Sequence, residues 1–321
     1  MPGYAVLFPG QGSQFVGMGR DLYGSSAAAR AVFDEADSLW QGELTRLVFE
    51  GPADRLTDTV NAQPALYVTS LACWAALQEA LGSSAPEPSV AAGHSLGEYA
   101  ALAVAGVFSF GTGLQLVSER GRAMKAAGDA EPGSMAAILG LDLETVSDIC
   151  REAAAQSGEV VVVANDNAPG QVVISGKPEG VRVAGDLAKA RGARRVVPLA
   201  VSIAAHSPLM EPAVDRFRQA VRRAELHPPR IPVIANRDAQ PLESVPAIVA
   251  ELEGQLITPV RWTPSIRHII NLGISTFIEV GPKDVLTGLV RRIAPEATCL
   301  PCGDLAGVKQ AAELLRQMPH S

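Results

Sequence analysis

Short apolar runs alternate with longer stretches of mixed polarity along most of the chain. The runs Tyr4–Phe8 and Val90–Ala92 are each followed by a glycine-containing turn, which is typical of short buried strands. Pro64 suits the first turn of a helix that we predict over residues 64–81. Further helices are predicted at about residues 26–39, 96–105 and 112–126. This alternation of strands and helices indicates an α/β fold with a mainly parallel sheet.

The middle of the chain has a different order of elements. We predict strands at residues 134–139, 160–165, 171–175 and 194–199, and helices at residues 142–155 and 178–191. The order β-α-β-β-α-β is that of a ferredoxin-like unit. We therefore expect a small subdomain over residues 129–200, inserted in a large one made of residues 1–128 and 201–321. Strands at residues 231–236 and 276–280 continue the large subdomain.

The stretch GHSLG, from Gly93 to Gly97, lies between a predicted strand and a predicted helix. A serine in such a turn is the nucleophile of many hydrolases, and the flanking glycines leave room for the strained backbone. The N-terminus of the helix would place N–H groups and partial positive charge beside an oxyanion. Ser95 is therefore a candidate nucleophile. The alternative is a glycine-rich turn in which Ser95 only caps the helix.

A serine nucleophile needs a base, and the chain has five histidines. His206 follows a predicted strand in a loop of small residues that would let a substrate approach, so it is the candidate base; a loop histidine without a role is the alternative. His94 should point away from Ser95 at the turn. His227 falls in a proline-rich turn, His268 in an amphipathic helix and His320 in the C-terminal tail. No Asp or Glu stands where a hydrolase triad would need it, so we expect a dyad oriented by a neutral carbonyl.

Composition narrows the possible functions. Hydrophobic residues make up 47% and charged residues 19% of the 321 residues, and the net charge is −7, which argues against a nucleic-acid binder. Cys299 and Cys302 have the spacing of a metal or redox half-site, but no second pair accompanies them and no strand–helix start is predicted nearby, so we expect no such role. With no signal peptide or membrane-spanning run recognised, we expect a soluble cytoplasmic protein.

Eight ordered motifs give the chain a family resemblance. It resembles the malonyl-CoA:acyl carrier protein transacylases and the related acyltransferase domains of polyketide and fatty-acid synthases. The motifs are LFPGQGSQFVGMG, NAQPALY, GHSLGEYAAL, ERGRAM, NDNAPGQVVISG, HSPLM, PVRW and EVGP, and they run from Leu7 to Pro282. The fold that this resemblance implies is an α/β-hydrolase-like large subdomain with a ferredoxin-like insertion, which agrees with the predicted elements.

The resemblance implies a role for each matching residue. Ser95 corresponds to the nucleophile and His206 to its base. Gln255 corresponds to the glutamine whose carbonyl orients that histidine, and this accounts for the missing acid. The backbone N–H groups of Gln11 and Leu96 correspond to the oxyanion hole.

Arg120 corresponds to the arginine that holds the free carboxylate of malonate. A buried guanidinium favours a diacid because a neutral acyl group would leave its charge unpaired, at a cost of about 2–5 kcal/mol. On the residues alone, a surface arginine in a run with Arg122 and Lys125 is the alternative. Other substrate-binding positions are Met124, Gln63, Asn165, Asn167 and Ala205. For the two asparagines, a structural role in a turn is the alternative. Arg194 and Arg195 are candidates for the phosphates of coenzyme A, and an edge strand blunted by charge is their alternative.

One departure from the family concerns the acyl group. Many malonyl-selective members have a bulky aromatic residue directly before the histidine, whereas this chain has Ala205. The smaller side chain leaves room for an α-methyl group, but one methyl is worth only about 1–3 kcal/mol of discrimination. We expect malonyl as the acyl group, with a methylmalonyl-selective acyltransferase of polyketide synthesis as the alternative.

The expected activity is a ping-pong transfer from malonyl-CoA to the phosphopantetheine thiol of an acyl carrier protein in fatty-acid or polyketide synthesis. Coenzyme A is a co-substrate, and no metal or other cofactor is implied. We expect a monomer that docks its carrier at a basic patch, either Arg194 and Arg195 or Arg291 and Arg292. A serine thioesterase or other acyl hydrolase is one rival, and an inactive scaffold domain of a larger synthase is the other.

Overall fold

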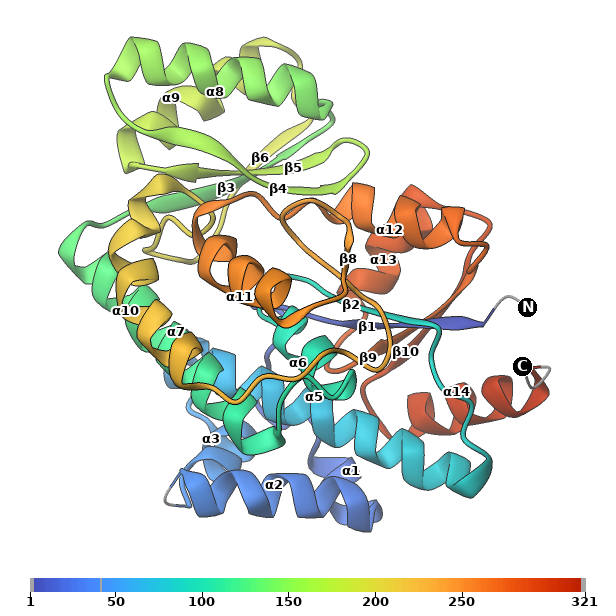
Figure 1. The fold of residues 1–321 in the computed structure, drawn as a ribbon. Helices are drawn as coiled ribbons and strands as arrows, with labels where there is room; N and C mark the ends of the chain where they lie inside the picture. Colours follow the sequence, from blue (N-terminus) through green and yellow to red (C-terminus); the bar gives the residue numbers. More distant parts are fainter. Residues whose placement is uncertain (1–2, 41, 319–321) are drawn as a thin grey trace.

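The computed structural model describes residues 3–40 and 42–318, arranged around two β-sheets (Figure 1). The strands are β1 (Tyr4–Phe8), β2 (Val90–Gly93), β3 (Ser134–Leu139), β4 (Val161–Ala168), β5 (Gln171–Gly176), β6 (Arg195–Pro198), β7 (Val233–Ile234), β8 (Pro241–Leu242), β9 (Thr276–Val280) and β10 (Thr298–Cys302). The helices are α1 (Arg20–Ser25), α2 (Ala27–Leu39), α3 (Leu44–Glu50), α4 (Ala53–Thr57), α5 (Thr59–Leu81), α6 (Gly97–Val104), α7 (Phe110–Ala130), α8 (Leu143–Ser157), α9 (Pro178–Ala190), α10 (Glu211–Arg223), α11 (Val245–Gly254), α12 (Trp262–Asn271), α13 (Val285–Ile293) and α14 (Leu305–Gln317). Short 3₁₀ turns lie at Gly82–Ser84, Pro208–Met210 and Gln255–Ile257.

The larger sheet has six strands in the order β10-β9-β1-β2-β7-β8. All neighbouring pairs are parallel except β7 with β8. The predicted α/β fold with a mainly parallel sheet is therefore confirmed. Because the carboxyl ends of parallel strands meet at one edge, the residues that follow β1, β2 and β7 come together there.

The core lies on both faces of this sheet. Successive residues of β1 point to opposite sides, so that Val6 and Phe8 pack in one cluster with α5, α6 and α14, whereas Ala5 and Leu7 pack in another with α12 and α13. Figure 1 shows these two helical layers on either side of the sheet. Among the described residues, no helix is both long and apolar enough to cross a membrane.

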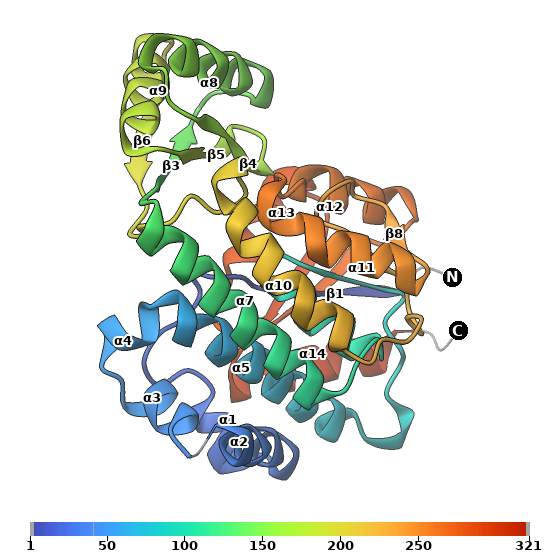
Figure 2. The same cartoon turned by 60° about the vertical axis from the view of Figure 1, so that its left-hand side comes forward.

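The smaller sheet has four strands in the order β4-β5-β3-β6, and all of its neighbouring pairs are antiparallel. Helices α8 and α9 pack on one face of it. This is the ferredoxin-like arrangement that the sequence predicts. Figure 2 shows the small subdomain at one end of the molecule, beyond α7 and α10, which lie side by side. The subdomain boundaries at 129 and 200 stay a prediction.

Strand β4 also joins the two subdomains. The N–H of Asp166 donates to Val260 O at 2.9 Å, and the N–H of Val260 donates to Ala164 O at 2.8 Å. The register of β4 against β5 shifts twice in this stretch, between Val163 and Asn165 and again between Asp166 and Ala168. Such bulges turn side chains out of the regular alternation, and they occur here where β4 passes the large subdomain.

The placement of Pro64 in the first turn of its helix is wrong, because α5 begins at Thr59. The carboxylate of Asp58 caps this end by accepting from the N–H of Val60 at 3.1 Å. Pro64 therefore lies inside the helix, where it removes one backbone hydrogen bond. Most of α5 is buried between other helices, and this packing offsets the loss.

The two cysteines with half-site spacing lie in β10, a strand that the sequence analysis missed, and α14 follows directly. The expectation that no strand–helix start lies near them is therefore wrong. Residues three apart in a strand face opposite sides, and Cys302 packs in one core cluster while Cys299 packs in the other. The two thiols cannot share one metal ion. His320, expected in the C-terminal tail, falls outside the described residues.

Candidate active site

Ser95 lies at the sharp turn between β2 and α6. Its φ of 52° is in the left-handed region, which is strained for a residue with a side chain. A Cβ on Gly93 would lie 2.0 Å from the carbonyl carbon of Gly97, and a Cβ on Gly97 would lie 2.0 Å from Phe8 O. Both glycines are therefore needed for the turn to pack this closely, and the turn places the hydroxyl at the carboxyl edge of the sheet.

His206 is the partner of this hydroxyl. Its Nε2 lies 2.9 Å from Ser95 Oγ, and its Nδ1 lies 3.0 Å from Gln255 O and 3.1 Å from Thr258 O. Because carbonyls only accept, Nδ1 carries the proton and Nε2 offers a lone pair to the hydroxyl. Burial, and then the charge of Arg120, lower the pKa of His206 from 6.5 to about 3. The imidazole is thus neutral and able to take a proton.

Two backbone N–H groups lie beside Ser95. Leu96 follows the serine and precedes α6, and Gln11 follows β1 at the same edge of the sheet. Neither N–H donates a hydrogen bond to another described residue. The hydroxyl of Thr59 donates to Gln11 Oε1 at 3.1 Å and holds that side chain. Two uncommitted donors next to a nucleophile are what an oxyanion hole requires.

Arg120 is buried, with 1% of its surface exposed. Its Nη1 donates to Gln63 Oε1 at 2.9 Å, and its Nη2 donates to Gln255 Oε1 at 2.9 Å and to Ser95 Oγ at 3.0 Å. Its Nε has no partner, and no ion pair includes it among the described residues. The surface alternative is therefore wrong for Arg120. A buried guanidinium without a carboxylate is suited to binding one.

Two residues that sequence reasoning missed lie behind the serine. Asn236 Oδ1 accepts from the N–H of Ser95 at 2.7 Å, and Asn236 Nδ2 donates to Gly93 O at 2.7 Å. Glu98 is fully buried, and its Oε1 accepts from Asn236 Nδ2 at 3.0 Å. Burial and the nearby carboxylate of Glu251 raise the pKa of Glu98 well above its usual range. Asn236 could have been found from its position two residues after the end of β7.

A cavity of about 300 Å³ opens between the two sheets at Ser95 and His206. The sequence-predicted residues that line it are Gln11, Arg120, Met124, Asn165, Asn167 and Ala205. His94 makes no hydrogen bond with Ser95, yet it lines the same cavity, and its Nε2 lies 2.7 Å from Asn167 Oδ1. Gln63 does not line the cavity but supports Arg120 from behind.

Arg194 and Arg195 lie outside this cavity. Both are exposed, and they stand where β6 begins, whereas the cavity wall starts at Leu199, just after that strand. Four residues of strand separate the two points, which is about 13 Å. The structure therefore does not bring these arginines to the reacting groups.

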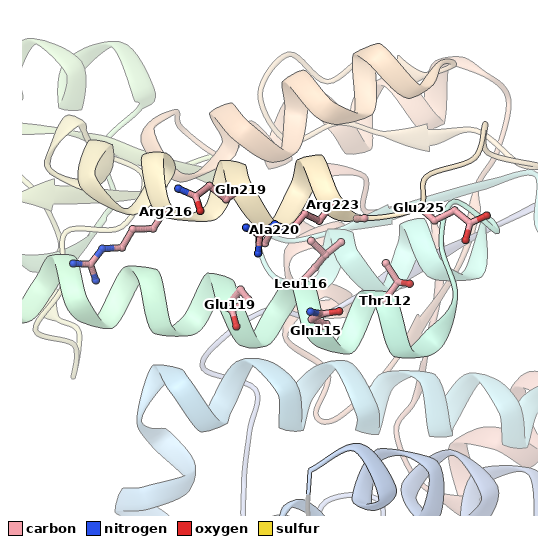
Figure 3. Close-up of a pocket in the computed structure, with 10 residues that line it drawn as sticks. Thr112, Gln115, Leu116, Glu119, Arg216, Gln219, Ala220, Arg223 and Glu225 are labelled. Carbon is pink, nitrogen blue, oxygen red and sulfur yellow. The ribbon is translucent and has the colours of Figure 1, made fainter.

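Another groove, of about 370 Å³, lies between α7 and α10. Figure 3 shows Gln115 and Glu119 of α7 facing Arg216, Gln219 and Arg223 of α10 across it. No serine, cysteine or histidine lines it, so it offers no nucleophile and base. Across the described parts of the chain, no three His, Cys, Asp or Glu side chains gather as a metal site would require.

Comparisons with known proteins agree with the resemblance. The family model of the acyl transferase domain matches residues 6–313. The malonyl CoA-acyl carrier protein transacylase of Bacillus subtilis is 42% identical over 313 residues, covering 98% of this chain and 97% of that protein. The protein of the same name from Escherichia coli is 40% identical over 314 residues, covering 98% and 100%.

One similar solved structure contains a partner. It is a type II PKS acyl-carrier protein in complex with its malonyl-transacylase, and it aligns with a TM-score of 0.92 at 41% identity, covering 97% of this chain and 99% of that one.

Proposed function

Because the chain belongs to the acyl transferase family, we propose that it transfers the malonyl group of malonyl-CoA to the phosphopantetheine thiol of an acyl carrier protein. The observation that carries this proposal is the position of Arg120. Its buried guanidinium lies 3.0 Å from the hydroxyl that His206 can deprotonate, and it has no carboxylate of its own. A diacid thioester can supply that carboxylate while its carbonyl reaches the serine.

In the first half-reaction, His206 Nε2 accepts the proton of Ser95 Oγ as the oxygen attacks the thioester carbonyl. The N–H groups of Gln11 and Leu96 donate to the oxyanion. The tetrahedral intermediate then collapses, the C–S bond breaks, and coenzyme A leaves with the proton from His206. The backbone carbonyls of Gln255 and Thr258 stabilise the imidazolium that forms in between.

In the second half-reaction, the phosphopantetheine thiol takes the place of coenzyme A. His206 accepts the thiol proton, the sulfur attacks the malonyl ester, and Ser95 leaves as its hydroxyl. Arg120 holds the malonyl carboxylate through both steps, which keeps the ester carbonyl at the oxyanion donors. Every residue invoked belongs to one chain, so the proposal requires only a monomer.

A reconstituted reaction with malonyl-CoA and holo acyl carrier protein tests this proposal, with the mass of the carrier as the readout. We expect malonyl-carrier to form, and we expect none with apo carrier, which lacks the thiol. Release of coenzyme A at the same rate without any carrier would instead favour the hydrolase.

Malonyl is the proposed acyl group, because Arg120 can bind its carboxylate while the oxyanion donors bind its thioester carbonyl, and no further site is needed. Ala205 lines the cavity beside His206 and is small, which keeps methylmalonyl as the second candidate. Competition between the two thioesters for Ser95 distinguishes them.

We also propose a cytoplasmic location and no cofactor beyond the co-substrate. All four cysteines are free thiols, as a reducing compartment would keep them.

The pH dependence of acylation follows from the lowered pKa of His206. The folded-state pKa of about 3 lies below the usual 6.5, so the base is already neutral at physiological pH. We expect acylation by acetyl-CoA, whose acyl group does not titrate, to change little between about pH 8 and pH 5. In Arg120→Ala the loss of the neighbouring charge raises this pKa, so the acidic loss of rate moves to higher pH. A single-turnover acylation rate that falls in the wild type with a midpoint near pH 6.5 would contradict the account.

The same pKa shift affects stability. The unfolded chain binds a proton at His206 below about pH 6.5, whereas the folded chain excludes it until about pH 3. This contribution to stability is therefore fully present above pH 6.5 and is lost as the pH falls toward 3.

We propose that basic residues around the turn between β4 and β5 contact the phosphates of coenzyme A and the acyl carrier protein. Arg292 donates to Gln171 Oε1 at 2.6 Å and to Pro169 O at 2.9 Å, and Gly170 lies against both Gly140 and Arg292. Arg194 lies against Gly140. Arg194 and Arg292, one from each arginine pair named from the sequence, thus border one turn, and an acidic carrier could meet both of them.

We expect the double change Arg194→Glu, Arg195→Glu to raise KM for malonyl-CoA and for the carrier several-fold, with little change in kcat, because exposed charges at the rim act on encounter. The effect should shrink as salt is added. Arg182→Glu is the matched control, since Arg182 is an exposed arginine already paired with Glu179 and Asp186 on α9. Unchanged KM values for both substrates would rule out this contact.

A further inference from the structure

Glu98 is a buried carboxylate that the proposed mechanism does not use. It lies in the first turn of α6, three residues after Ser95, and none of its surface is exposed. Its Oε1 accepts from the backbone N–H of Asn236 at 2.9 Å and from Asn236 Nδ2 at 3.0 Å. Its Oε2 accepts from Gln255 Nε2. No lysine or arginine pairs with it in the described part of the chain, so its partners are all neutral amides.

The two side-chain amides that contact Glu98 are the ones that hold the active site. Asn236 Oδ1 accepts from the N–H of Ser95 and Asn236 Nδ2 donates to Gly93 O, so this side chain spans the turn of the nucleophile. Gln255 Oε1 accepts from Arg120 Nη2 at 2.9 Å, and Gln255 Nε2 donates to Ser95 O at 3.1 Å. Its backbone carbonyl accepts from His206.

A side-chain amide can turn over and exchange its donor end for its acceptor end, whereas both oxygens of Glu98 accept in this structure, Oε1 from Asn236 and Oε2 from Gln255. Both amides must therefore present their NH₂ groups to Glu98. Their oxygens then face the N–H of Ser95 and the guanidinium of Arg120, which are the two donors that need acceptors. The opposite orientation of Gln255 would point a donor at Arg120.

We propose that Glu98 is a positioning residue that fixes Asn236 and Gln255 in the single orientation that supports both the nucleophile turn and the arginine clamp. The inference rests on the proposed function, since it assigns Arg120 to the malonyl carboxylate. Glu98 does not touch the substrate; it acts through Gln255 on acyl selectivity.

The isosteric change Glu98→Gln has an unequal effect on the two amides. The backbone N–H of Asn236 cannot turn over, so the new side chain keeps its oxygen there and presents its NH₂ group to Gln255. Gln255 then turns over, and its NH₂ group faces Arg120. We expect the malonyl clamp to weaken, while the two hydrogen bonds that Asn236 makes to the turn at Ser95 are kept.

The measurement is the acylation rate of Ser95 with malonyl-CoA and with acetyl-CoA, for the wild type and Glu98→Gln. We expect the malonyl-to-acetyl ratio of kcat/KM to fall roughly 10- to 100-fold, mainly through KM for malonyl-CoA, since a charged hydrogen bond is lost. Glu98→Asp keeps a carboxyl group, so its ratio should lie nearer to the wild type.

Glu279→Gln is the matched control. Glu279 is another buried glutamate, 1% exposed, and it accepts from the backbone N–H groups of Leu286 at 2.9 Å and Thr287 at 2.6 Å without touching either side-chain amide. Its ratio should stay at the wild-type value. If Glu98→Gln does not fold, Gln255→Met tests the same link, because it removes the amide and leaves the carbonyl that His206 uses.

A Glu98→Gln enzyme that keeps its ratio, or that loses both rates equally, would overturn the inference, as would an unchanged ratio in Gln255→Met. A wild type that takes up acetyl but no malonyl group would refute the proposed function as well. A wild type with a malonyl adduct and an unaffected Glu98→Gln would refute the positioning role alone.

Discussion

Replacing Ser95 by alanine is expected to abolish malonyl transfer to the carrier, with a loss of at least about 10⁴-fold in kcat. The hydroxyl is the only group that lies within hydrogen-bond reach of both His206 Nε2 and Arg120 Nη2 in the described structure. Without it, no acyl-enzyme forms, so neither half-reaction can take place. The rate of malonyl-carrier formation, followed by mass spectrometry, checks this result.

Ser175→Ala is the matched control for this change. Ser175 is a fully buried serine in β5 of the small subdomain, and its hydroxyl has no hydrogen-bond partner. Its replacement should leave transfer unchanged. Transfer by a Ser95→Ala enzyme at even a few per cent of the wild-type rate would remove Ser95 from the account.

Replacing Arg120 by alanine is expected to reverse the acyl preference. The change removes the cation that faces the malonyl carboxylate, which is worth about 2–5 kcal/mol, or roughly 30- to 4,000-fold in kcat/KM for malonyl-CoA. Acylation by acetyl-CoA should fall little, because the nucleophile, the base and the oxyanion donors remain. Rates of adduct formation with each thioester measure the ratio.

Arg122→Ala is the control that separates the loss of the Arg120 guanidinium from the loss of any positive charge on α7. Arg122 lies two residues further along α7, is exposed, and pairs with Glu119 at 2.6 Å. Exposed pairs of this kind contribute little to stability, so both rates should match the wild type. Because Arg120 also supports Gln63 and Gln255, thermal unfolding should accompany the assay. An equal loss with both thioesters in a folded Arg120→Ala enzyme would contradict the clamp.

The fold was largely predictable because its elements have clear local signals. The runs at 4–8 and 276–280 are mainly apolar and end in turns, and the observed strands have the same bounds. The order of elements in the small subdomain was enough to predict its topology. Strand β10 was missed because Pro301 and the polar ends of Thr298–Cys302 hide a short strand that only its parallel neighbour stabilises. The start of α5 was missed because Asp58 and Pro64 give conflicting signals.

The site was predictable only in part. Ser95 and His206 stand out from the residues, whereas Gln255 and Arg120 were recognised only by resemblance, because nothing local marks them. Arg120 has the sequence surroundings of a surface arginine, and only the packing of α7 against α5 shows that it is buried. The roles of Asn236 and Glu98 depend on hydrogen bonds between segments more than 130 residues apart, which no local pattern encodes.

The most direct test of the account is the mass of the intact protein after brief exposure to an equal mixture of malonyl-CoA, methylmalonyl-CoA and acetyl-CoA. The account predicts a malonyl adduct on Ser95 that is lost in Ser95→Ala and disappears when holo carrier is added. A mainly methylmalonyl adduct would assign methylmalonyl as the acyl group and would leave the role of Arg120 in binding its carboxylate unchanged. A mainly acetyl adduct, or free coenzyme A without any adduct or carrier, would contradict the central claim that Arg120 selects a diacid for transfer.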